Sequence, residues 1–155
     1  MLSKGLPEFQ RLGPGAPLHL HISEQTAEVE ECLEWSGLRP VQWLFENLEP
    51  DSNWCLIHAT HLDSQERRTL AESEVTVGLC PTTEANLGDG IFPMQEFMEE
   101  GGGFGIGSDS HVSISPSEEL RWLEYQQRLL QRQRNLLYGE SGMSTGRYLY
   151  KQALA

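Results

Sequence analysis

Polar residues that could bind a metal ion or transfer protons follow several short apolar segments of this sequence. His21 ends the first segment and Glu24 lies three residues later, His58 ends the second, and Asp109 follows the fourth. Imidazole and carboxylate groups bind cations such as zinc. A further carboxylate can move protons, and a further imidazole can polarise the group under attack. If the fold brings these four side chains together, they favour metal-assisted hydrolysis.

Each of these residues also has a simpler interpretation. A single histidine at a strand end is more often a hydrogen-bonded structural group than a ligand. His61 and His111 follow the second and fourth segments, where they could line the same pocket or only support it and face solvent. His19 is expected to be structural. Spacing alone therefore leaves both interpretations open.

The apolar segments have the length and composition of strands, and helical patterns separate them. Strands are expected at 18–22, 54–58, 75–80 and 104–108, a loop at 82–89, and helices at 24–35, 40–48, 64–73, 93–100, 115–137 and 144–155. Alternating strands and helices predict an α/β fold with a parallel sheet. The sheet could be open and doubly wound, or part of a (β/α)8 barrel. Polar strand ends favour the barrel, because its strand ends converge on one face.

Composition excludes several functional classes. The net charge of −12 argues against a nucleic-acid-binding surface. No apolar run approaches the length of a membrane span, and residues 1–15 lack a signal-peptide pattern. The glycine-rich run 101–107 precedes a strand and so is a poor phosphate-binding loop. Three widely spaced cysteines without a CxxC motif indicate reduced thiols in a cytoplasmic protein.

Four segments resemble the second half of the amidohydrolase-superfamily barrel, and most closely the formimidoylglutamate deiminase family of histidine degradation. They are residues 21–25 (HISEQ), 54–61 (WCLIHATH), 78–92 (GLCPTTEANLGDGIF) and 105–113 (GIGSDSHVS). The third segment is the most specific. The resemblance implies an α/β fold comprising strands 5–8 of an amidohydrolase-type (β/α)8 TIM barrel. Residues 1–155 would then form one partial domain, truncated at both ends.

The resemblance also implies a role for each strand-end residue. His21 and Asp109 would bind one zinc ion, and Asp109 would also accept the proton of the attacking water. Glu24 would shuttle protons to the leaving amine, and His58 would assist the water and the tetrahedral intermediate. The reaction implied is hydrolysis of N-formimidoyl-L-glutamate to N-formyl-L-glutamate and ammonia.

Part of the site expected from the resemblance is missing from the sequence. The resemblance implies that a preceding half supplies two further zinc ligands, from a His-x-His pair. That half would also supply most of the residues that bind the substrate carboxylates.

The implied partners are a small-molecule substrate and, for the full-length family, further copies of the chain, with no nucleic acid and no membrane. Two alternatives stay open: a related deaminase or chlorohydrolase acting on a ring substrate, and an inactive truncated fragment. Some polar residues could shape the pocket or only build a loop (Thr83, Glu84, Asn86), and others are expected to form a solvated helix face (Arg121, Arg128, Arg132, Arg134).

Overall fold

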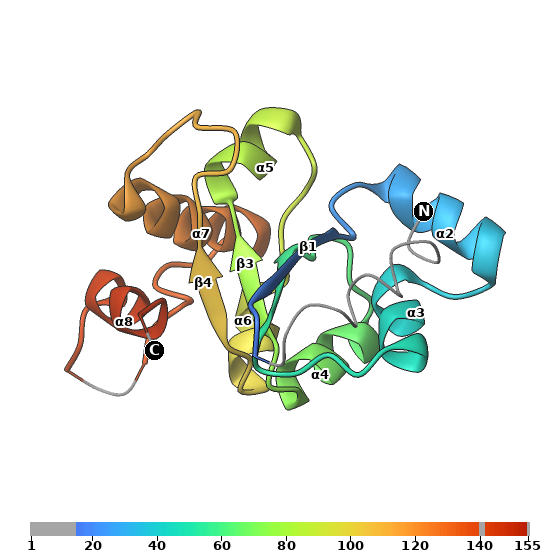
Figure 1. Ribbon diagram of the computed structural model, residues 1–155. Coiled ribbons are helices and arrows are strands. Elements are labelled where there is room, and N and C mark those ends of the chain that lie inside the picture. The colour runs from blue at the N-terminus through green and yellow to red at the C-terminus, as the bar shows by residue number, and fades with distance from the viewer. Residues whose placement is uncertain (1–14, 140–141, 155) are drawn as a thin grey trace.

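A four-stranded parallel sheet forms the centre of the molecule (Figure 1). The computed structural model describes residues 15–139 and 142–154, so almost all of the segment 1–15, where the sequence lacks a signal-peptide pattern, lies outside the described residues. The strands are β1 (Leu18–Ile22), β2 (Trp54–His58), β3 (Thr76–Leu79) and β4 (Phe104–Ile106). They pair in chain order, and every pair is parallel. The predicted α/β class with a parallel sheet is therefore confirmed.

Helices connect the strands and lie mostly within two residues of the expected bounds. In Figure 1 the pair that follows β1 lies toward the β1 end of the strand order, and the last two helices lie toward the β4 end. No helix in the described ranges is long and apolar enough to cross a membrane. The helices are α2 (Thr26–Ser36), α3 (Pro40–Asn47), α4 (Ser64–Glu72), α5 (Pro81–Leu87), α6 (Met94–Glu99), α7 (Pro116–Gln131) and α8 (Thr145–Gln152).

The expectation of a loop at 82–89 is wrong, because α5 occupies most of it. Pro81 stands at the first helical position, where its missing N–H removes no hydrogen bond. Gly88 ends the helix with a left-handed φ of 74°, and its N–H donates to the carbonyl of Glu84. Proline at the start and glycine after the end are helix signals, and they outweigh the turn-forming residues between them.

The long helix expected to reach residue 137 ends earlier, at Gln131. Arg132 adopts a left-handed φ of 56° and ends α7. The chain then turns back, and the Glu124 carboxylate accepts the N–H groups of Leu136 at 3.2 Å and Leu137 at 2.9 Å. Leu137 is buried in the core from this turn. Its apolar character therefore reflects tertiary packing instead of a continuing helix.

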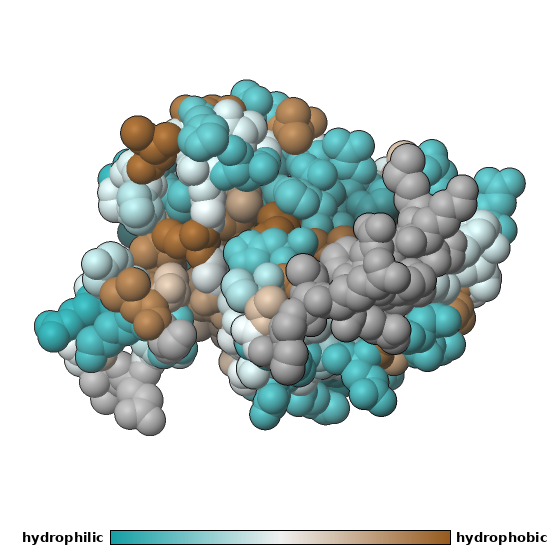
Figure 2. Space-filling view, viewed as in Figure 1, coloured by the Kyte–Doolittle hydropathy of each residue, from teal (hydrophilic) through white to brown (hydrophobic). Residues whose placement is uncertain are grey.

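The hydrophobic core lies against one face of the sheet. Leu56 and Val77 are fully buried there, together with side chains of the helices such as Leu44, Leu70 and Leu123. The opposite face is less covered. His19 is exposed, and Cys55 and Ile57 are only half-buried. Hydrophobic residues accordingly reach the surface around β4 in the space-filling view (Figure 2).

We expect the 155-residue chain on its own to associate with itself. Within the described ranges, β1 and β4 each pair with a single strand, so both leave hydrogen-bonding groups unpaired at an edge. The half-buried side chains on the open face add apolar surface. Size-exclusion chromatography with light scattering should show dimers or larger species. A monomer that melts in one cooperative transition would contradict this expectation.

Candidate active site

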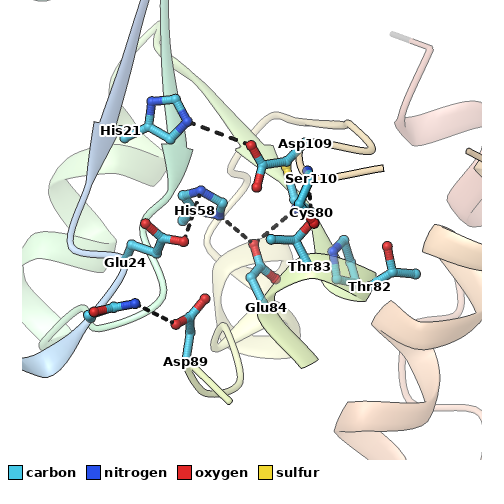
Figure 3. A network of polar contacts seen from close by, with 12 residues as sticks. His21, Glu24, His58, Cys80, Thr82, Thr83, Glu84, Asp89, Asp109 and Ser110 are labelled. Carbon is cyan, nitrogen blue, oxygen red and sulfur yellow. Dashed lines mark hydrogen bonds and ion pairs between the residues drawn. The ribbon is translucent and has the colours of Figure 1, made fainter. Parts of the chain in front are cut away.

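The polar residues predicted at the strand ends meet at the carboxyl edge of the sheet. His21 Nε2 lies 4.0 Å from Asp109 Oδ1, and His58 Nε2 lies 3.5 Å from Glu24 Oε1. The rings of His21 and His58 have centroids 5.3 Å apart. Figure 3 shows these side chains pointing toward one another from β1, β2 and the segment after β4. The structure thus brings together all four residues that the sequence singled out.

Two backbone hydrogen bonds to one carboxylate, just after β1, direct Glu24 into the site. The Glu28 carboxylate, in the first turn of α2, accepts the N–H of Ser23 at 2.8 Å and of Glu24 at 2.9 Å. A carboxylate in the first turn of a helix also interacts favourably with the helix dipole. Ser23 has a left-handed φ of 51°, and the chain turns sharply there. Glu24 therefore projects back over the strand end toward His58.

His58 is the most enclosed member of the group. It is 0% exposed, and its backbone has a φ of 70°, which L-residues adopt only with strain. Its Nδ1 lies 3.1 Å from Oε1 of Glu84, which is 1% exposed. Its Nε2 is buried but makes no hydrogen bond within the described residues. One ring nitrogen is therefore held by the protein, and the other is available toward Glu24.

Two groups in the site have raised pKa values. Burial alone lowers the pKa of His58, but the hydrogen bond to Glu84 and the surrounding negative charges outweigh burial and raise it. Burial raises the pKa of Glu24; His58 opposes this shift, and the carboxylates of Asp89 and Asp109 add to it. A carboxyl group that holds its proton more readily than free glutamate suits proton transfer near neutral pH.

A hydroxyl contact from α5 holds the loop that carries Asp109. Thr83 Oγ1 lies 2.9 Å from Ser110 Oγ, donates to the carbonyl of Ser108 at 3.3 Å, and accepts the N–H of Ser110 at 3.3 Å. Asp109 lies between these contacts with a φ of 39°. Thr83 thus helps to hold the loop of Asp109, which differs from the two roles considered from sequence, shaping the pocket or building its own loop.

His21 and Asp109 offer the donor atoms of a zinc site. Their 4.0 Å separation is near the sum of two zinc–ligand bonds of roughly 2.0–2.2 Å each, so the two atoms would have to approach slightly in a tetrahedral site. Their side chains are 63% and 31% exposed, so they remain accessible to a cation. The potential ligand atoms of His21, His58 and Asp109 all lie within 4.8 Å of one another. One imidazole and one carboxylate are half of a four-coordinate zinc site.

A second compact group, formed by His58, Cys80 and Glu84, is less suited to a metal. Glu84 Oε1 already accepts the Cys80 N–H at 2.9 Å and contacts His58. Burial, helped by nearby carboxylates such as Glu84, raises the pKa of the Cys80 thiol to about 12. All three residues are buried and Glu84 is already used within the chain, which leaves little access for a metal ion. This group is better described as a hydrogen-bonded support for His58.

We expect Cys80 to resist alkylation in the folded chain. Cys80 is 4% exposed and its raised pKa keeps the thiol protonated, whereas Cys32 is only half-buried. Iodoacetamide treatment followed by peptide mass spectrometry should show Cys32 modified well before Cys80. After denaturation both should react at similar rates. Equal labelling of the two cysteines in the native chain would contradict the burial of Cys80.

The other polar residues considered from sequence have smaller roles. The His61 ring contacts the carbonyl of Asp89 through Nε2 at 2.8 Å, which supports a loop at the edge of the site. His111 and His19 are exposed, and His19 lies on the same sheet face as His21. Arg128 departs from the solvated-face expectation, because it pairs with buried Glu124 at 2.6 Å. The remaining arginines of that set are exposed as expected: Arg121, Arg132 and Arg134.

Sequence reasoning missed two contacts that shape the site. Glu84 was considered only as a loop or pocket residue, yet it contacts His58. Asp89 was expected only as the last residue of the loop at 82–89, yet its side chain accepts a hydrogen bond from Gln25 Nε2 at 3.2 Å and so links the segments after β1 and β3. The helix signals at Pro81 and Gly88 could have placed Glu84 on α5. No sequence signal pairs it with a histidine in another element.

Comparisons with known proteins find related sequences. The model of the Amidohydrolase family matches residues 14–152. The chain is 58% identical over 139 residues to formimidoylglutamate deiminase from Pseudomonas aeruginosa, covering 90% of this chain and 31% of that protein. It is 37% identical over 99 residues to 5-methylthioadenosine/S-adenosylhomocysteine deaminase from Natronomonas pharaonis, covering 64% of this chain and 23% of that protein.

Solved structures share the fold. An amidohydrolase from Brucella melitensis superposes with a TM-score of 0.94 at 50% identity, covering 99% of this chain and 34% of the other. A zinc-bound adenosine deaminase from Xanthomonas campestris superposes with a TM-score of 0.77 at 21% identity, covering 97% of this chain and 32% of the other. The chain therefore spans about a third of the length of these proteins.

Proposed function

Since this chain belongs to the amidohydrolase family, we propose that it supplies strands 5–8 of a (β/α)8 barrel. The reaction proposed for the whole barrel is hydrolysis of N-formimidoyl-L-glutamate to N-formyl-L-glutamate and ammonia, as a step of histidine degradation. The observation that carries the proposal is the meeting of His21, Glu24, His58 and Asp109 at one edge of a parallel sheet. The 58% identity to a formimidoylglutamate deiminase supports the substrate. One-sided covering of the sheet supports the half-barrel.

The chain's own residues divide the proton transfers between them. Asp109 accepts a proton from the water that attacks the formimino carbon. Glu24, whose pKa is raised, carries a proton to the nitrogen that leaves as ammonia. His58 faces the same space through Nε2 and hydrogen-bonds to the attacking water or the developing tetrahedral centre. The buried Nε2, which lacks a partner in the described residues, fits this role.

His21 and Asp109 would hold the zinc ion. When bound, zinc supplies Lewis acidity that makes a water molecule nucleophilic at neutral pH. Two ligands from this chain are too few for a tight site. We propose that two histidines from outside this chain complete it. The groups that bind the glutamate carboxylates are proposed to lie there as well.

A ring-acting deaminase is the second candidate. The 37% identity to a 5-methylthioadenosine/S-adenosylhomocysteine deaminase favours it, and the same four site residues would serve either reaction. The segment 78–92, which forms the end of β3 and all of α5, is the part of the sequence most specific to the first candidate.

The test uses a full-length chimera, in which this chain replaces the 139 aligned residues of the Pseudomonas aeruginosa deiminase. Ammonia release is measured with N-formimidoyl-L-glutamate and with S-adenosylhomocysteine, and the 155-residue chain alone is assayed in parallel. We expect kcat/KM for formimidoylglutamate close to that of the unmodified deiminase, with no turnover of the nucleoside and none by the chain alone. A folded, zinc-loaded chimera that fails to release ammonia from formimidoylglutamate would refute the proposal.

A further inference from the structure

The contact between Glu84 and His58 has a consequence beyond the four residues assigned above. We propose that Glu84 is a positioning residue that keeps Nδ1 of His58 protonated and leaves Nε2 free to face the reacting group. The inference about the ring itself rests only on the structure. Its catalytic consequence rests on the proposed hydrolase function.

The direction of the hydrogen bond follows from the chemistry of the two groups. An ionised carboxylate can only accept hydrogen bonds. Glu84 Oε1 already accepts the Cys80 N–H at 2.9 Å, and the Nδ1 atom of His58 lies 3.1 Å away. The imidazole must therefore donate from Nδ1. When the ring is neutral its single proton is fixed there, and Nε2 becomes an acceptor.

The protein holds both partners rigidly. Glu84 lies on α5, and the start of that helix is fixed by α7. Glu119 accepts the Thr82 N–H at 2.9 Å and the Thr82 hydroxyl at 2.6 Å. His58 has no room to turn, since it is 0% exposed and ends β2 in a left-handed conformation. A rigid acceptor beside a fixed ring is the arrangement that orients histidines at catalytic centres.

Glu84 could instead serve only to satisfy the backbone at the start of α5. Its bond to the Cys80 N–H would then matter for stability, and its effect on the reaction would not depend on His58. The two readings differ in what happens to the ring when Glu84 is replaced. They also differ in the rate of the double variant. If Glu84 acts through His58, replacing Glu84 has no further effect once His58 is removed; if Glu84 acts only on the backbone, the two losses add.

The first test reads the ring directly. The chain is labelled with 15N-histidine, and long-range 1H–15N NMR is recorded at a pH where His58 is neutral. We expect the Nδ1–H form in the natural chain and a shift to the Nε2–H form in Glu84→Leu. Glu124→Leu is the matched control, because it also removes a buried carboxylate that accepts backbone N–H groups but should leave the His58 tautomer unchanged. An Nε2–H ring in the natural chain would overturn the proposal.

The second test is a double-mutant cycle in the chimera. It decides the question even if self-association of the labelled chain prevents the NMR measurement. Glu84→Leu should lower kcat/KM by about 10- to 100-fold with zinc content unchanged. Glu84→Gln should lie within a few-fold of the parent, since its amide oxygen can still accept from Nδ1. In a His58→Ala background, Glu84→Leu should cost nothing further. Equal losses in both backgrounds would show that Glu84 acts independently of His58.

Discussion

Replacing Asp109 with asparagine in the chimera is expected to lower kcat/KM by about 10³-fold or more, because Asp109 is proposed to serve both as metal ligand and as base. Asparagine has a similar shape but carries no charge and accepts no proton. Zinc content should also fall, since one of the two ligands in this chain is weakened. Steady-state ammonia release and metal analysis of the purified variant measure the two effects.

The control for this variant is Glu72→Gln, which neutralises an exposed carboxylate at the end of α4. It removes the same charge far from the strand ends, so rate and zinc content should both match the parent chimera. Asp109 would be neither a metal ligand nor the base if Asp109→Asn kept its full zinc content and a rate within about 10-fold of the parent. Loss of a catalytic base should cost far more than that.

Replacing Glu24 with glutamine is expected to lower kcat by about 10²- to 10⁴-fold while zinc content stays unchanged. Glu24 contacts His58 at 3.5 Å but is not among the residues placed to hold the metal. Glutamine keeps the length of the side chain and cannot carry a proton to the leaving nitrogen. Separate measurement of kcat and KM should place most of the loss in kcat.

Glu30→Gln is the matched control, because Glu30 is an exposed carboxylate on the adjoining helix α2. It should leave kcat and KM unchanged. A Glu24→Gln variant that lost its zinc together with its activity would instead make Glu24 part of the metal site. One that kept the parent kcat would remove it from the reaction altogether.

The strands and the meeting of the four site residues could be predicted from sequence, because both follow from local pattern and simple topology. Apolar runs such as 54–57 mark buried strands. Once the sheet is parallel, its carboxyl ends meet at one edge, so residues after different strands come together. The order β1-β2-β3-β4 brought His21, His58 and Asp109 within reach of one another in this way.

The supports of the site could not be predicted, because they depend on contacts between distant elements. Glu84 is 26 residues from His58, and nothing local to either residue indicates the bond between them. The end of α7 shows the same limit. Leu136 and Leu137 continue an apolar helical pattern, yet a carboxylate on the preceding helix turns the chain back at that point. The contact between Glu84 and His58 and the end of α7 both depend on tertiary contacts that the local sequence does not reveal.

The most direct measurement of the central claim is ammonia release from N-formimidoyl-L-glutamate by the chimera before chelation, after chelation, and after zinc is restored. In the parent chimera, hydrolysis should be lost when the chelator is added and recovered when zinc is restored. The His21→Ala variant, which lacks one proposed ligand, should need far more zinc to recover any activity. Full activity in the chelated parent, or recovery of His21→Ala at the same zinc concentration as the parent, would contradict the proposed metal-dependent deiminase.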